Sequence, residues 1–159
     1  MFFALLCAVA AAVVVMDQYT KFLTVANIAL YQDVPFLPGF LNFTYVRNTG
    51  AAFSSFEGMQ WLFALVFAVF TVMILWEYFR KPMPFRKHER LLIAAIYGGG
   101  LGNMIDRIRL GYVVDMIETQ FITFPVFNVA DCFITGGCVL LMVSLVFFNK
   151  DFWKEEEKK

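Results

Sequence analysis

The sequence predicts a single membrane-embedded α-helical domain of 159 residues, with four transmembrane helices and a small β-rich subdomain outside the membrane. The chain is 60% hydrophobic and contains 20 phenylalanines, so it is far more apolar than a soluble domain of this length. Its apolar residues gather in stretches of about 20, the length that a helix needs to cross a hydrocarbon core about 30 Å thick. The solvent of this chain is therefore expected to be lipid.

Four stretches have this length, at residues 2–23, 59–79, 91–110 and 130–148. The first resembles a cleavable signal peptide, but it lacks a basic start and continues apolar to Met16, so a retained helix is expected. The third is the least apolar, because glycines and charged residues dilute it. Glycine allows helix backbones to approach closely, so this composition still fits a packed bundle.

The basic residues of the links predict the orientation, because short cytoplasmic links are rich in Lys and Arg. The link at residues 80–90 is strongly basic, whereas the link at residues 24–58 has Arg47 alone. The first link is therefore expected in the cytoplasm together with both termini, and His88 within it is interpreted as a solvated loop residue. Residues 24–58 and 111–129 are then expected on the outer face.

The outer segments have the patterns of strands rather than of featureless loops. The run PGFLNFTYV is rich in β-forming residues and leads to an Asn-Thr-Gly turn signal at residues 48–50. The runs GYVVDMI and FITFPVFNVAD are similar, with Gly111 as a stop for the third helix and Pro125 as the end of any strand. A small sheet at the membrane surface is predicted.

Several chemistries are excluded by composition. Cys7, Cys132 and Cys138 lie in apolar runs without metal-ligand spacing, so they are predicted to be small buried packing residues. With one histidine, a His-based metal site or a Ser/His mechanism is not expected. We expect no metal, no cofactor and no nucleic-acid partner.

Polar residues gather near the outer ends of the predicted helices, where such groups usually face a bundle interior or a wet cavity. Structural roles explain several of them. Asp17 and Lys21 are four residues apart and can form an ion pair on one helical face. Asn128 with an acid three residues later, Asp131, is close to a capping box. The full set is Asp17, Lys21, Asn103, Asp106, Arg107, Asp115, Asn128 and Asp131.

Asp106 and Asp115 differ in their surroundings along the chain. Asp106 lies on one helical face with Asn103 and directly precedes Arg107, so these local partners are expected to hold it as a charged structural group. Asp115 lies in an apolar segment without a basic residue within five positions. Capping does not explain this second carboxylate near Asp131. Two close aspartates can share one proton and activate water against an amide.

Four stretches resemble, in order, the signature boxes of the bacterial lipoprotein signal peptidases (signal peptidase II). They are MDQYTK at 16–21, YVRNTGAAFS at 45–54, GGGLGNMIDRIRLGYVVDMI at 98–117 and FPVFNVAD at 124–131. The resemblance implies an aspartic endopeptidase of the bacterial cytoplasmic (inner) membrane, active near its outer face without a cofactor. Such enzymes cleave prolipoproteins on the amino side of a diacylglyceryl-modified cysteine, and globomycin-like cyclic peptides inhibit them.

The resemblance also implies roles for individual residues. The catalytic aspartates fall on Asp115 and Asp131. The polar residues of the substrate cleft fall on Asn48, Asn103, Arg107 and Asn128. Asp17, Lys21, Asp106 and Ala130 match positions that support the fold.

Two other classes remain open from the residues. One is a small transporter or channel subunit, in which intramembrane charges would form an ion or proton path across the bilayer. The other is a noncatalytic membrane assembly factor with a structural polar cluster. The charges here collect at one face, which favours the enzyme.

Overall fold

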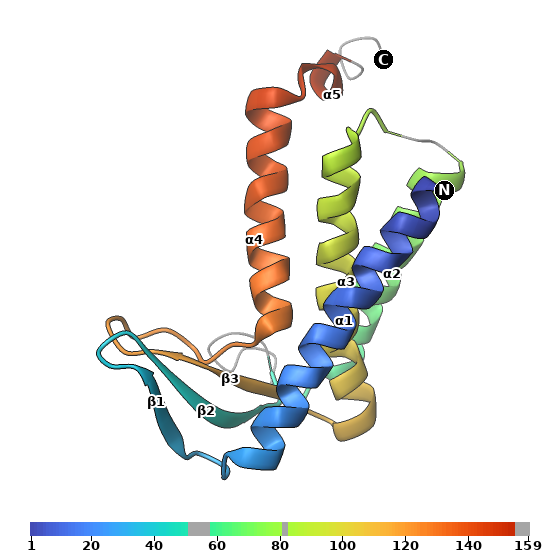
Figure 1. Cartoon of the computed structure of the whole chain (residues 1–159). Coiled ribbons are helices and arrows are strands. Elements are labelled where there is room, and N and C mark those ends of the chain that lie inside the picture. Colours follow the sequence, from blue (N-terminus) through green and yellow to red (C-terminus); the bar gives the residue numbers. More distant parts are fainter. Residues whose placement is uncertain (51–57, 81–82, 155–159) are drawn as a thin grey trace.

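A computed structural model describes residues 1–50, 58–80 and 83–154. The helices form a bundle, and a small sheet projects from one end of it (Figure 1). The N-terminus and the short helix α5 (Lys150–Lys154) lie at the opposite end. Predicted features that fall on residues 51–57, 81–82 and 155–159 lie outside the described residues, including part of the box at 45–54 and Lys81.

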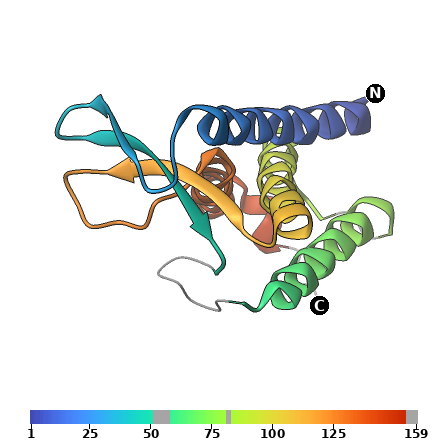
Figure 2. The ribbon, with the colours of Figure 1, turned by 90° about the horizontal axis from the view of Figure 1, so that it is seen from below.

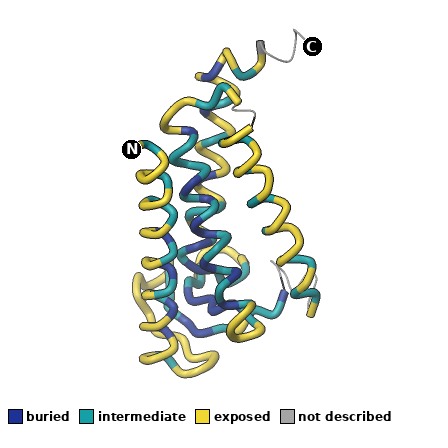
Figure 3. The backbone as a smooth tube through the Cα atoms, turned by 90° about the vertical axis from the view of Figure 1, so that its right-hand side faces the viewer, coloured by how far each residue is buried: buried dark blue, intermediate teal, exposed yellow. Residues whose placement is uncertain are grey.

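Three of the described helices are long and apolar enough to cross a membrane. They are α1 (Phe2–Asn27), α2 (Gln60–Phe79), and α4 (Val129–Val143) with its π-helical continuation η2 (Ser144–Phe148). α1 runs on past residue 23, where its end was predicted. α2 has no buried residue (Figure 3), as expected for a helix that faces lipid on most sides. A mostly helical membrane protein with a small sheet is thus confirmed.

The fourth predicted transmembrane helix is not confirmed by length and apolarity. α3 (Lys87–Leu110) has 24 residues, but its apolarity is below that of the other three helices. It lies between α1 and α4, with α2 on its remaining side (Figure 2), and buried residues follow its length (Figure 3). Because neighbouring helices cover α3, its surface does not need to be apolar. α3 also starts early enough to place His88 in its first turn, not in a loop.

Glycines allow α1 and α4 to pack closely against α3, as the sequence predicted. A Cβ atom at Gly98 would lie 2.6 Å from the carbonyl oxygen of Ala10, and one at Gly99 would lie 2.7 Å from that of Ala130. A Cβ atom at Gly102 would lie 2.5 Å from Asp17 Oδ2. Any larger residue at these positions would push the helices apart and would displace the polar groups near Asp17.

The predicted sheet is present and antiparallel, in the order β1 (Asp33–Leu37), β2 (Leu41–Asn48), β3 (Val113–Thr119). Gly111 ends α3 in the left-handed conformation, with φ of 80°, and turns the chain directly into β3. After β3 the chain returns alongside it through an antiparallel bridge between Ile117 and Phe127. These turns bring the end of β2, the middle of β3 and the start of α4 together.

The prediction that the cysteines are buried packing residues is wrong. Cys7, Cys132 and Cys138 are all exposed on the protein surface. In a membrane protein an apolar position need not be an interior one, because lipid accepts apolar side chains as well as a core does.

Candidate functional site

Asp115 lies in the middle of β3 and is almost fully buried, with 2% of its surface exposed. Asn48 ends the neighbouring strand β2 and pairs with Val113, so its side chain lies diagonally across from Asp115 on the same face of the sheet. The Nδ2 atom of Asn48 donates to Asp115 Oδ2 at 2.8 Å. The Nδ2 atom of Asn128 donates to Asp115 Oδ1 at 2.6 Å. Both carboxyl oxygens therefore accept an amide N–H.

Asp131 lies in the first turn of α4, and the predicted capping box is confirmed. The backbone N–H of Asn128 donates to Asp131 Oδ2 at 3.1 Å, and that of Asp131 donates to Asn128 Oδ1 at 3.0 Å. The other carboxyl oxygen, Oδ1, accepts from Nδ2 of Asn103 at 2.8 Å. An acid at this place is stabilised in its charged form by the free amides and the dipole of the helix start.

Asn128 contacts both aspartates and is fully buried. Its side chain donates to Asp115, and its backbone N–H donates to Asp131. Its side-chain oxygen caps α4, and its NH₂ group holds Asp115. A direct contact of Asn128 with substrate stays a prediction.

A buried ionic cluster lies behind the aspartates. Lys21 Nζ is 2.9 Å from Asp17 Oδ2 and 3.0 Å from Asp106 Oδ2, so the predicted pair of Asp17 and Lys21 is present and has a third member. Lys21 also donates to Asn103 Oδ1 at 2.9 Å. The three charged side chains are each at most 4% exposed. This cluster joins α1 to α3.

Asp106 does not have the partners that the sequence predicted. Neither Asn103 nor Arg107 holds its carboxylate. Its carboxylate is held by Lys21, by Nε2 of Gln18 at 2.9 Å and by the backbone N–H of Val114 at 3.1 Å. Neighbouring positions of a helix point in different directions, which is why Arg107 faces elsewhere. Asp106 is an ion-paired group that also fastens β3 to α3.

Ala130 is fully buried, and its backbone N–H donates to Asp17 Oδ1 at 3.1 Å. Asp17 therefore satisfies one of the free amides at the start of α4 while it pairs with Lys21. Gly99 packs directly against the backbone of Ala130, so a side chain at position 99 would collide with the start of α4. Because Ala130 itself is fully buried, a larger side chain there would have to displace its neighbours.

Arg107 extends from α3 toward the segment after β2. Its Nη2 atom donates to the carbonyl oxygen of Gly50 at 2.9 Å, and its guanidinium carbon lies 4.2 Å from the centre of the Phe63 ring. Its Nε atom is buried without a hydrogen-bond partner among the described residues. Arg107 thus brings a cation to the wall of the site.

A cavity of about 530 Å³ contains both aspartates. Asn48, Asn103 and Arg107 line it as expected, at its polar end. The other walls are mainly apolar and come from β3, the segment before α4 and the first two turns of α4. They are Val113, Phe124, Pro125, Val126, Phe127, Cys132, Thr135 and Gly136. The cavity therefore combines polar groups, two carboxyl groups among them, with a mainly apolar wall.

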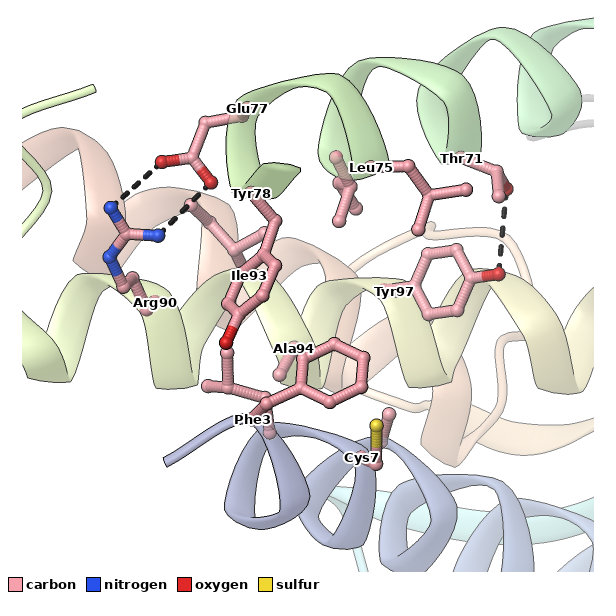
Figure 4. Close-up of a pocket in the computed structure, with 13 residues that line it drawn as sticks. Phe3, Cys7, Thr71, Leu75, Glu77, Tyr78, Arg90, Ile93, Ala94 and Tyr97 are labelled. Atoms are coloured by element: carbon pink, nitrogen blue, oxygen red, sulfur yellow. Dashed lines mark hydrogen bonds and ion pairs between the residues drawn. The ribbon is translucent and has the colours of Figure 1, made fainter. Parts of the chain in front are cut away.

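A second cavity, of about 210 Å³, lies between α1, α2 and α3 near the end opposite the sheet (Figure 4). Its charged lining groups, Glu77 and Arg90, pair with each other at 2.9 Å. Thr71 and Tyr97 share a hydrogen bond of 3.5 Å. Because its carboxylate is paired with Arg90 and its remaining walls are mainly apolar, this cavity is not a candidate for proton chemistry.

The two carboxyl groups are in different environments. The pKa of Asp115 is raised to about 7, against a usual value of 3.8, mainly by burial and also by the nearby charge of Asp131. The amides of Asn48 and Asn128 act in the opposite direction without cancelling the effect of burial. Asp115 is therefore able to hold a proton near neutral pH.

This pKa predicts how stability depends on pH. The folded state binds the Asp115 proton more tightly than the unfolded chain does, so its contribution to stability is fully present below about pH 4 and is lost as pH rises through about 7. The melting temperature of the wild type, relative to that of Asp115→Asn, should fall over this range and then level off. A difference that stays constant from pH 4 to 8 would contradict the raised pKa.

Some residues of the ionic cluster and of the cavity wall were not predicted from the sequence. Gln18 donates to Asp106 and to the carbonyl oxygen of Gly102, and its position as an amide inside an apolar helix was an available signal. Thr135 and Gly136 line the cavity one turn after Asp131, but small residues in an apolar helix give no distinct signal. Within the described part of the chain, no three His, Cys, Asp or Glu side chains gather as metal ligands.

Comparisons with known proteins agree with this architecture. The profile of a family described as Signal peptidase (SPase) II matches residues 9–147. A lipoprotein signal peptidase of Streptococcus agalactiae serotype Ia is 43% identical over 143 residues, which cover 90% of this chain and 88% of that protein. Another, of Streptococcus pyogenes serotype M1, is 41% identical over 147 residues, which cover 91% of this chain and 90% of that protein.

Two solved structures are similar over nearly their whole length, and both are described as bacterial membrane enzymes determined by the in meso method. The structure at 2.3 Å resolution has a TM-score of 0.84 and 28% identity, and the match covers 95% of this chain and 93% of that one. The structure at 1.9 Å resolution has a TM-score of 0.82 and 29% identity, and the match covers 93% of this chain and 96% of that one.

Proposed function

Because the chain belongs to the signal peptidase II family, the proteases that process bacterial lipoproteins, we propose that Asp115 and Asp131 are its catalytic dyad. The family makes this chain a multi-pass bacterial membrane protein that cleaves the signal peptides of lipoproteins. One observation carries the assignment of the dyad. The two aspartates line one cavity, and both accept hydrogen bonds from Asn128.

In the proposed resting state Asp131 is ionised and Asp115 carries the shared proton. Asp115 is buried among apolar neighbours, whereas Asp131 faces free amides at the start of α4. Asp131 then accepts a proton from the attacking water, while the O–H of Asp115 donates to the scissile carbonyl oxygen. The proton on Asp131 passes to the leaving amine when the tetrahedral intermediate collapses. The pair titrates as a unit, so these are the dominant microstates.

The substrate is a prolipoprotein with a diacylglyceryl-modified cysteine, cleaved on the amino side of that cysteine. Asn48, Asn103 and Arg107 supply donors for the peptide at the polar end of the cavity. Along α4 the wall continues through exposed Cys132, so the cavity reaches the apolar surface of the helix. The diacylglyceryl chains stay in membrane lipid on that side. Globomycin-like cyclic peptides would occupy the same cavity.

We further propose that α3 is a fourth membrane span, which places both termini in the cytoplasm and the site near the outer face of the cytoplasmic membrane. Its 24 residues make a helix about 36 Å long, enough to cross the hydrocarbon core. The segments expected outside are residues 24–58 and 111–129, and residues 80–90 are expected in the cytoplasm.

The topology is tested by labelling single cysteines in intact cells, in a variant without Cys7, Cys132 and Cys138. An impermeant maleimide should label Gln120→Cys and should not label Lys87→Cys until the cells are opened. Both positions are exposed, and they lie at opposite ends of the bundle. Labelling of residue 87 but not residue 120 in intact cells would show that the orientation is reversed.

The function is tested by incubating the purified protein in detergent with a prolipoprotein that carries the diacylglyceryl group. Release of the signal peptide is expected, and the same precursor without the lipid should remain uncleaved. A small transporter or channel subunit, the alternative function, would release no signal peptide from either precursor. Absence of cleavage by a folded wild-type protein would count against the enzyme.

A further inference from the structure

Asn103 lies between the ionic cluster and the aspartate at the start of α4. Its Oδ1 atom accepts from Lys21 Nζ at 2.9 Å and from Asn128 Nδ2 at 3.1 Å. Its Nδ2 atom donates to Asp131 Oδ1 at 2.8 Å. A side-chain amide has one donor end and one acceptor end, so the orientation of Asn103 decides which of them Asp131 meets.

The other donors to the two aspartates have a fixed orientation for local reasons. Asn48 Oδ1 accepts from the backbone N–H of Gly50 at 3.0 Å, and Asn128 Oδ1 accepts from that of Asp131 at 3.0 Å. A backbone N–H is only a donor, so each of these amides must turn its NH₂ group toward Asp115. Among the described residues, no backbone N–H donates to the side-chain oxygen of Asn103. Two side chains donate to it, and the ammonium of Lys21 at 2.9 Å is a stronger, charged donor than the neutral amide of Asn128 at 3.1 Å.

We propose that Lys21 is a positioning residue for catalysis, because its ammonium holds the Asn103 amide with its N–H toward Asp131. This inference rests on the proposed function of the dyad and adds a role for Lys21 beyond pairing with Asp17 and Asp106. An ammonium is only a donor, so a reversed amide would place N–H groups against Lys21 and an oxygen against the carboxylate.

The step at which Lys21 matters most follows the attack of water. Asp131 has then taken a proton and is neutral, so its own preference for the N–H of Asn103 weakens. A reversed Asn103 would accept the new O–H of Asp131 and keep the proton from the leaving amine. Lys21, as the charged one of the two donors to the Asn103 oxygen, contributes most to opposing this reversal, so the proton remains free to transfer.

A single Lys21→Met variant leaves two buried carboxylates unpaired and can fail to fold. The informative variant is therefore Lys21→Met with Asp106→Asn, which removes one ammonium and one carboxylate together. Asp106→Asn alone, which keeps Lys21 between Asp17 and Asn103, is its matched control. Turnover is measured per folded molecule on the lipidated precursor.

The double variant should have a kcat about 10- to 100-fold below that of Asp106→Asn, the effect of one hydrogen bond to a charged group, with little change in KM. Lys21→Arg, also a pure donor, should retain most of the turnover. When Asn103→Ala is added to both proteins, Lys21→Met should cause no further loss of kcat. A residue that only supports the fold would lower the folded fraction and leave kcat unchanged.

Equal kcat values for the double variant and Asp106→Asn would overturn the inference, and so would an undiminished loss in the Asn103→Ala proteins. If the double variant does not fold, NMR of the wild type decides. The Asn103 amide protons should show no contact with the ε-methylene of Lys21, whereas a reversed amide would show one. A wild type that cleaves nothing would instead defeat the proposed function.

Discussion

Replacement of Asp115 or Asp131 by asparagine is expected to lower the rate of signal-peptide release by about 10²- to 10⁴-fold, the usual contribution of a general acid or base. Both side chains line the cavity and accept hydrogen bonds from amides. Asparagine keeps their size but can neither take a proton from water nor hold the shared proton. Rates of cleavage of the lipidated precursor, per folded molecule, measure the loss.

Asp106→Asn is the matched control, because Asp106 is paired with Lys21 and does not line the cavity. It should lower the melting temperature and leave most of the turnover per folded molecule. Globomycin binding should persist in the Asp115 and Asp131 variants, which shows that the cavity is intact. If Asp115→Asn retained substantial turnover while a well-folded, inhibitor-binding Asp106→Asn were inactive, the dyad would be Asp106 with Asp131.

Asp115→Asn should also have a measurable structural effect. Asn48 and Asn128 both turn an N–H toward this position, one to each carboxyl oxygen. An asparagine offers an oxygen to one of them and an NH₂ group to the other, so one donor loses its partner. A melting temperature moderately below the wild-type value is therefore compatible with a direct catalytic role, and rates must be corrected for the folded fraction.

Lys21→Met is expected to cause the largest loss of stability, about 3–5 kcal/mol, because it removes the ammonium that neutralises two buried carboxylates. Among the described residues, Lys21 is the cation paired with both Asp17 and Asp106, at 2.9 Å and 3.0 Å. Thermal or denaturant unfolding in detergent measures the change. Lys150→Met removes an exposed lysine and should have little effect.

A second substitution tests the cause of that loss. Adding Asp106→Asn to Lys21→Met removes one of the stranded carboxylates, so part of the stability should return. A fold stabilised mainly by the aliphatic part of Lys21 would behave differently, because methionine replaces that part. In that case Lys21→Met alone would be close to the wild type in stability.

The helical membrane class and the outer sheet could be predicted from the sequence because both depend on local patterns. Apolar runs of sufficient length predict α1, α2 and α4, and the β-rich runs predict β2 and β3. β1 precedes the first of these runs and was not predicted, and the run FITFPVFNVAD contributes an isolated bridge at Phe127 and no strand. The pattern also predicts the helix α3, but its span is not confirmed by apolarity, because its composition reflects helix neighbours as much as lipid. A residue that faces another helix and one that faces lipid obey different rules, and the sequence alone does not say which is which.

The sequence by itself also determined the interactions within one turn of helix, namely the capping box of Asn128 with Asp131 and the pair of Asp17 with Lys21. Their geometry follows from a spacing of three or four residues. The tertiary structure alone decided that Asp106 pairs with Lys21 and that Asn103 donates to Asp131. These contacts join different elements, so they depend on the glycine-controlled packing of the helices and on the register of β3, which no local pattern encodes.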